Sequence, residues 1–117
     1  MPSSAHRLID AFLRGDASSA ASLIAPDAEF HSPIRDYAGA AQISSVWRAV
    51  AGVVTNARVI SAHERDGERI VFFAGTIKDQ SVDGVLRTLT GDDGVNDITL
   101  MLRPWPALKA GLADLTL

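Results

Sequence analysis

The stretch Pro26-Asp27-Ala28-Glu29-Phe30-His31-Ser32-Pro33 decides how this chain is divided. Its first proline ends a helical pattern that runs from Ala17 to Ala25, because proline has no N–H for a helix interior. The residues around Phe30 then alternate as in a strand, with polar groups beside an aromatic ring. We therefore expect a helix to end at Pro26 and a strand beside a pocket to follow.

The composition is that of an ordinary globular domain. Apolar residues make up 47% of the 117 residues and charged residues 21%, which favours a buried core over disorder. This length suits one core, so we expect a single domain over residues 1–117. The net charge is −3 and Lys and Arg do not cluster, so the sequence offers no basic surface for binding nucleic acid.

Several kinds of chemistry have no residues to support them. The chain has no cysteine, which excludes disulfides, thiolate nucleophiles and cysteine-ligated metals. Neither His31 nor His63 belongs to a metal-ligand spacing, and nucleotide-binding motifs are missing, so we expect no metal and no cofactor. No 18 consecutive residues are apolar and the N-terminus lacks a leader pattern, so we expect a cytoplasmic protein without membrane association.

Helical spacing dominates the first half of the chain. Apolar residues from Ala5 to Leu13 recur at three and four positions, and Gly15 is suited to end that helix. Asp16 is a plausible N-cap for the second helix, over 17–25. A third helix is predicted where Ile43, Val46, Trp47 and Val50 repeat, with its end near Gly52.

Strand patterns dominate the second half. Residues 58–64 and 69–78 flank Asp66-Gly67, a strong signal for a tight hairpin turn. Residues 81–90 and 97–103 are joined by a turn through 91–94, and they predict a second hairpin. Pro104 and Pro106 end the last strand, and Leu108, Leu112 and Leu115 suggest a short closing helix. Helices first and strands last indicate an α+β fold, with N-terminal helices packed on an antiparallel sheet.

Two segments carry a family resemblance. Residues 26–33 and the stretch Leu100-Met101-Leu102-Arg103-Pro104-Trp105-Pro106 make the chain resemble the nuclear transport factor 2-like superfamily, in its SnoaL-like branch. The resemblance implies a strongly curved, cone-shaped antiparallel sheet that is closed by helices around a cavity. It also implies a homodimer formed through the outer face of the sheet.

The ketosteroid isomerases of that superfamily provide a test for catalysis. Their reaction needs an aspartate base together with a tyrosine and a protonated aspartate that hold the enolate oxygen. The matching positions here are Leu8 for the tyrosine, Ser32 for the base and Leu86 for the acid. Leucine cannot donate a hydrogen bond and serine is too weak a base, so the isomerase mechanism is disfavoured.

His31 is the remaining candidate for acid–base chemistry. Polyketide cyclases of the SnoaL type and scytalone dehydratases, which the chain resembles in fold, use His and Asp in the cavity. An imidazole titrates near neutral pH and can move a proton. Strand alternation nevertheless turns His31 away from the cavity if Phe30 and Ser32 face it. A structural or interface role for His31 is therefore the stronger interpretation.

Three functions stay open at this point. The first is binding of a small apolar organic molecule in the cavity. The second is an isomerase, dehydratase or cyclase that uses His31 or a pocket carboxylate as general acid or base. The third is a non-enzymatic dimeric interaction module. The residues predicted to line the pocket are Leu8, Phe12, Phe30, Ser32, Trp47, Phe73, Leu86 and Leu100, since ligand pockets are mostly apolar.

Overall fold

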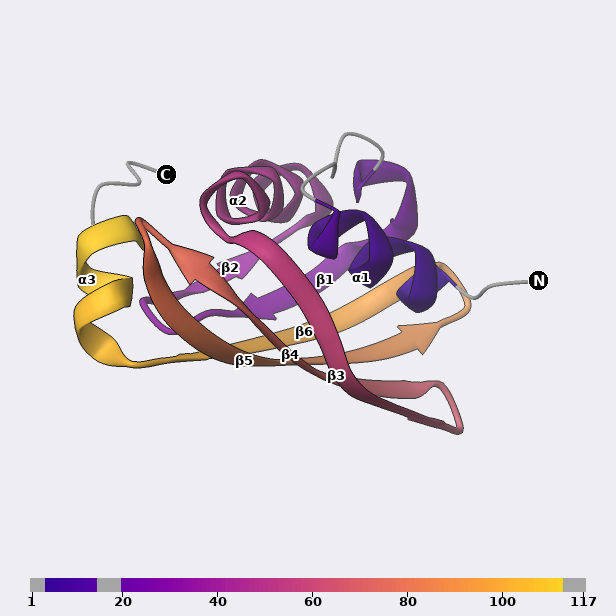
Figure 1. The fold of residues 1–117 in the computed structure, drawn as a ribbon. Helices are drawn as coiled ribbons and strands as arrows, with labels where there is room; N and C mark the ends of the chain where they lie inside the picture. Colours follow the sequence, from indigo (N-terminus) through magenta and orange to yellow (C-terminus); the bar gives the residue numbers. More distant parts are fainter. Residues whose placement is uncertain (1–3, 15–19, 113–117) are drawn as a thin grey trace.

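The computed structural model describes residues 4–14 and 20–112. In chain order the elements are α1 (Ser4–Leu13), a 3₁₀ helix η1 (Ala20–Leu23), β1 (Ile24–His31), β2 (Asp36–Ala38), α2 (Ala40–Val53), β3 (Thr55–Arg65), β4 (Glu68–Ile77), β5 (Gln80–Gly91), β6 (Gly94–Arg103) and α3 (Trp105–Leu112). The six strands form one sheet in the order β2-β1-β6-β5-β4-β3. The sheet is strongly curved, with α1 and α2 on one face and α3 at one end (Figure 1).

The helices bury the faces that their periodicity predicts. In α1 the side chains of Leu8, Ile9 and Phe12 are at most 2% exposed. In α2 the buried face includes Trp47 and Val50, and the helix ends one residue after Gly52. These faces and the inner face of the sheet form one apolar core. The α+β fold with a curved sheet and a short C-terminal helix is confirmed.

The sheet differs from the prediction in one pairing. Four of its five strand pairs are antiparallel, but β1 and β6 run parallel, with Phe30 opposite Ile98. The sheet is therefore mixed. Parallel pairing requires a long crossover connection between the two strands, and here the whole segment from β2 to β5 provides it.

The second helix was predicted wrongly at its end. Within the described part of that predicted helix, residues 20–25, the helical residues are those of η1, and Ile24 and Ala25 already belong to β1, which runs through Pro26. Both residues are buried, and Ile24 pairs with Val95 of β6. Pro26 is tolerated because the register with β6 shifts between Ile24 and Glu29, where the ladder needs no N–H from proline. Gly15, Asp16, the first residues of that predicted helix, and Leu115 lie outside the described residues.

Both predicted hairpins are present, and a further tight turn joins them. Asp66 and Gly67 have φ values of 51° and 84°, as a type I′ turn requires, between β3 and β4. The β4–β5 turn uses Lys78 and Asp79, with φ values of 47° and 67° and no glycine. Its positive φ values are uncommon for such residues. The strands β4, β5 and β6 thus form a continuous antiparallel meander.

Candidate functional site

Most of the predicted pocket residues lie in the interior, between the helices and the sheet. Leu8, Phe12, Phe30, Trp47, Phe73, Leu86 and Leu100 are each at most 1% exposed and belong to the same core cluster. The ring centroid of Trp47 lies 4.8 Å from that of Phe12 and 5.8 Å from that of Phe30. The structure thus brings these side chains together as a packed aromatic and aliphatic layer.

Three buried side-chain atoms have no hydrogen-bond partner among residues 4–14 and 20–112: the indole Nε1 of Trp47, Nε of Arg69 and the hydroxyl of Thr88. Trp47 and Thr88 are 0% exposed, and Arg69 is opposite Thr88 across β4 and β5. A buried donor without a partner costs roughly 1–3 kcal/mol, so each of these groups favours any acceptor that reaches it.

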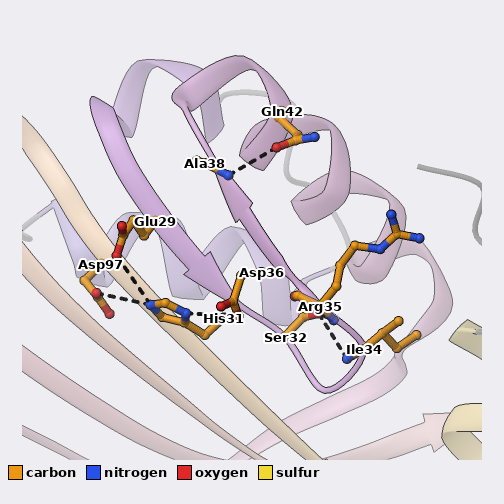
Figure 2. A network of polar contacts seen from close by, with 9 residues as sticks. All are labelled: Glu29, His31, Ser32, Ile34, Arg35, Asp36, Ala38, Gln42 and Asp97. Carbon is orange, nitrogen blue, oxygen red and sulfur yellow. Dashed lines mark hydrogen bonds and ion pairs between the residues drawn. The ribbon is translucent and has the colours of Figure 1, made fainter.

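Ser32, the eighth predicted pocket residue, lies in the loop after β1. Its hydroxyl donates to the carbonyl oxygen of Arg35 at 2.7 Å and accepts from the backbone N–H groups of Ile34 and Arg35 at 3.2 and 3.1 Å. These bonds are local to the turn that leads into β2 (Figure 2). The position that holds a base in the isomerases is thus engaged in loop structure.

A pocket opens on the opposite, outer face of the sheet. Its volume is about 470 Å³, and it crosses the strands β3 to β6. The lining is mainly apolar, and Asp83 and Arg103 form an ion pair of 3.2 Å between neighbouring strands. The lining residues are Ile60, Phe72, Phe73, Asp83, Gly84, Val85, Met101, Leu102 and Arg103. Only Phe73 is shared with the predicted set.

His31 lies on the same outer face, but on β1 and outside the lining of the pocket. Its strand neighbour Phe30 is 0% exposed and faces the core, so alternation turns the imidazole to the other side. Nδ1 of His31 lies 3.1 Å from Asp36 Oδ1, and Nε2 lies 3.5 Å from Asp97 Oδ2 and 3.8 Å from Glu29 Oε2. Figure 2 shows the ring between these three carboxylates.

The carboxylates change the ionisation of His31. Hydrogen bonding to Asp36 raises the pKa of the imidazole above its ordinary range, burial opposes this, and the charges of Asp36 and Asp97 add to the increase. The side chain of His31 is 37% exposed, so water screens these interactions. The ring thus gains protons more readily than an isolated histidine.

No local pattern in the sequence signals this cluster. Glu29 and His31 are two residues apart on β1, and this spacing alone is common in strands. Asp36 and Asp97 join them only because β2 and β6 flank β1 on its two sides. The expectation of no metal-ligand spacing rested on local spacing, whereas the juxtaposition depends on pairing between distant strands.

Comparison with known proteins settles the family. A family model described as SnoaL-like domain matches residues 5–99, most of the chain. The chain belongs to the SnoaL-like domain family. This places it in the SnoaL-like branch of the nuclear transport factor 2-like superfamily, as the two sequence segments indicated. No curated protein matches the sequence.

Several solved structures resemble this chain over nearly its whole length. An uncharacterised Silicibacter pomeroyi protein with a cystatin-like fold is 20% identical, with a TM-score of 0.84 over 94% of this chain and 80% of its own. A steroid delta-isomerase from Pseudomonas aeruginosa is 26% identical, with a TM-score of 0.82 over 92% and 82%. A hypothetical protein with a ketosteroid isomerase-like fold from Catenulispora acidiphila, in complex with trimethylamine, is 15% identical, with a TM-score of 0.69 over 94% and 92%.

Among the described residues, no helix is both long enough and apolar enough to cross a membrane.

Proposed function

We propose that this SnoaL-like protein binds a small apolar organic molecule, and that the ligand site is the pocket on the outer face of the sheet. The supporting observation is the pocket itself: about 470 Å³, lined mainly by apolar side chains. Ligand sites in proteins usually span about 300–1,000 Å³ and combine apolar walls with a few polar groups. The Asp83–Arg103 pair supplies those polar groups.

Exposure of the walls adds to this argument. Phe72 is 43% exposed and Met101 is 57% exposed, although both are large apolar residues on a folded sheet. A ligand that covers them removes apolar surface from water, at roughly 25 cal/mol per Å². The ligand class that fits is therefore an apolar molecule that carries one polar or charged group for Asp83 or Arg103.

The interior is the second location for such a ligand. There the predicted residues would supply the walls and Trp47 Nε1 would donate the hydrogen bond that it lacks among the described residues. A fold relative in complex with trimethylamine supports small-molecule binding as a use of this fold. The interior side chains are closely packed, so a ligand there must displace some of them, and the outer pocket needs no such change.

The test uses a fluorescent apolar probe, 1-anilinonaphthalene-8-sulfonate, and decanol as a non-fluorescent competitor. We expect probe binding to raise the melting temperature by linkage and decanol to displace the probe. Phe72→Ala and Met101→Ala should each weaken probe binding several-fold. Ile34→Ala removes a comparably exposed apolar side chain outside the pocket, so it serves as the matched control and should bind as the wild type does.

A conservative interior variant separates the two locations. Trp47→Phe removes the indole N–H and keeps an aromatic ring. Binding that is lost in Trp47→Phe and retained in Met101→Ala would place the ligand in the interior and overturn the outer site. No binding of either molecule and no change in melting temperature would count against the proposed function as a whole.

A specific observation also favours the interaction module as a second function. Val59, Ile60, Phe72 and Met101 are between 43% and 62% exposed. They lie on β3, β4 and β6, with β5 between β4 and β6 in the sheet, and three of them line the outer pocket. Exposed apolar surface of this kind is typical of protein interfaces. We propose that two copies of the chain pair through the outer face, and sedimentation velocity tests whether the chain forms a dimer.

The catalytic alternative keeps His31 as its acid–base group. Because His31 lies on the face opposite Phe30, such a reaction would have to act on a substrate bound at the outer face. Substitution of His31 by Ala, followed by assay of isomerase or dehydratase substrates, tests this alternative. Loss of turnover with a pH profile that follows an imidazole is the expected sign of this chemistry.

A further inference from the structure

Three adjacent strands direct polar side chains to one point on the outer face. Glu29 and His31 lie on the same face of β1, because they are two residues apart. Asp97 of β6 is in register with Glu29, and Asp36 of β2 is in register with His31. The sheet thus holds an imidazole and three carboxylates together on regular, paired backbone (Figure 2).

The spacing of three of these groups suits ligation of one ion. Single atoms of Glu29, His31 and Asp97 all lie within 4.8 Å of one another. His31 Nε2 is 3.5 Å from Asp97 Oδ2 and 3.8 Å from Glu29 Oε2. Zinc bonds of ~2.1 Å at tetrahedral angles place ligand atoms ~3.4 Å apart. A small rotation of the Glu29 side chain, which is 64% exposed, is enough to close this geometry.

The charges at this point are not balanced by the protein. Glu29 and Asp97 are directly opposite across the parallel strands, an arrangement that is unfavourable for like charges. In the described parts of the chain, the ion pairs of Glu29, Asp36 and Asp97 all go to His31, and no Lys or Arg joins them. Three carboxylates therefore face at most one positive imidazole, which leaves an excess of negative charge for a cation.

Asp36 fixes how the imidazole is presented. Its carboxylate lies 3.1 Å from Nδ1, so a neutral ring keeps its proton on Nδ1 and directs the lone pair of Nε2 at Glu29 and Asp97. Metal-bound histidines commonly have a carboxylate on the other ring nitrogen, which sets the tautomer and the ring orientation. Asp36 is thus a positioning residue and the other three are the direct ligands.

We propose that Glu29, His31 and Asp97 bind a divalent transition-metal ion of the zinc class. One imidazole nitrogen with carboxylate oxygens suits Zn²⁺ and its neighbours, whereas Ca²⁺ and Mg²⁺ prefer oxygen ligands alone. Three protein ligands leave at least one coordination position for water or another small molecule. This site is separate from the apolar pocket and does not depend on the ligand proposed for it.

Metal titration of the full chain tests the proposal. After treatment with EDTA and its removal, Zn²⁺ is titrated by calorimetry and Co²⁺ by visible absorption. We expect one ion per chain and the intense bands of tetrahedral Co²⁺. His31→Ala and Asp97→Asn should each weaken Zn²⁺ binding more than tenfold. Asp36→Asn should weaken it by about 10–100-fold and shift the Co²⁺ bands, as expected for loss of a partner that orients a ligand.

Two matched variants control for incidental binding. His63→Ala removes another exposed histidine of the sheet, and Asp27→Asn removes an exposed carboxylate of β1 outside the cluster. Both should bind Zn²⁺ as the wild type does, and circular dichroism checks that every variant is folded. Zn²⁺ binding that survives His31→Ala but is lost in His63→Ala would overturn the proposal. So would Ca²⁺ binding that matches Zn²⁺ and is unchanged in His31→Ala, because that result indicates a diffuse acidic surface.

Discussion

At the scale of single residues, the orientation of His31 is set by Phe30, the residue before it on β1. Phe30 is buried in the core, which commits His31 to the outer face, and the carboxylates of Glu29 and Asp97 meet it there. The same imidazole can hold a proton or a metal ion, but not both on Nε2. In the metal-free protein, only the proton can bind at Nε2.

This leads to a prediction on the pH dependence of stability in the presence of EDTA. The folded protein raises the pKa of His31 above the unfolded value of about 6.5. The stabilising effect is therefore full below pH ~6.5 and is lost as the pH rises through the folded pKa. We expect the urea-denaturation midpoint of the wild type to exceed that of His31→Gln at low pH, with the difference shrinking as the pH rises. A difference in urea midpoint that grows as the pH rises would contradict this prediction.

At the scale of elements, β5 depends on a residue without a side chain. A Cβ atom on Gly84 would lie 2.4 Å from Cζ of Phe73 and 2.8 Å from Cδ2 of Leu102 on the flanking strands. Phe73 is 1% exposed and its ring packs edge-on against Phe12, so it has little room to move. Gly84 thus lets three strands pack closely where the outer pocket lies.

We predict that Gly84→Ala lowers the free energy of unfolding by about 1–3 kcal/mol, the usual cost of overpacking a core. Gly91→Ala is the matched control on the same strand, because its Cβ would meet only the side chain of Asn96, which is exposed and can rotate away. Urea denaturation monitored by circular dichroism compares the two. Equal urea midpoints for both variants would show that the Phe73 ring moves aside at little energetic cost, and would contradict the prediction.

Elements with a local signal were predictable from the sequence, and elements set by distant pairing were not. The β3–β4 hairpin follows from Asp66-Gly67, whereas the β4–β5 turn at Lys78-Asp79 has no glycine to mark it. Whether Ile24 and Ala25 belong to a helix or to a strand depends on pairing with β6, which no local pattern reveals. For the same reason, alternation predicted which way His31 faces, but not that Asp97 would meet it.

At the scale of the whole molecule, the two faces of the sheet are used differently. The inner face is closed by α1 and α2 over a dense apolar core, so it supplies most of the stability (Figure 1). The outer face carries the pocket with its exposed apolar residues Ile60, Phe72 and Met101, and the His31 cluster. A ligand and a second copy of the chain therefore compete for the same apolar surface, which includes Phe72 and Met101.

This competition gives a prediction for the assembled protein. If the chain dimerises through the outer face, its affinity for 1-anilinonaphthalene-8-sulfonate should fall as the protein concentration rises, because dimers hide the pocket. Met101→Lys should give monomers in sedimentation velocity by placing a charge in the apolar interface, and Thr99→Lys should weaken the dimer less. Ile34→Lys adds the same charge at an exposed apolar residue outside the pocket and should leave the dimer intact. A dimer that tolerates Met101→Lys must use another surface. If the probe affinity does not change with protein concentration, the pocket is not part of the dimer interface.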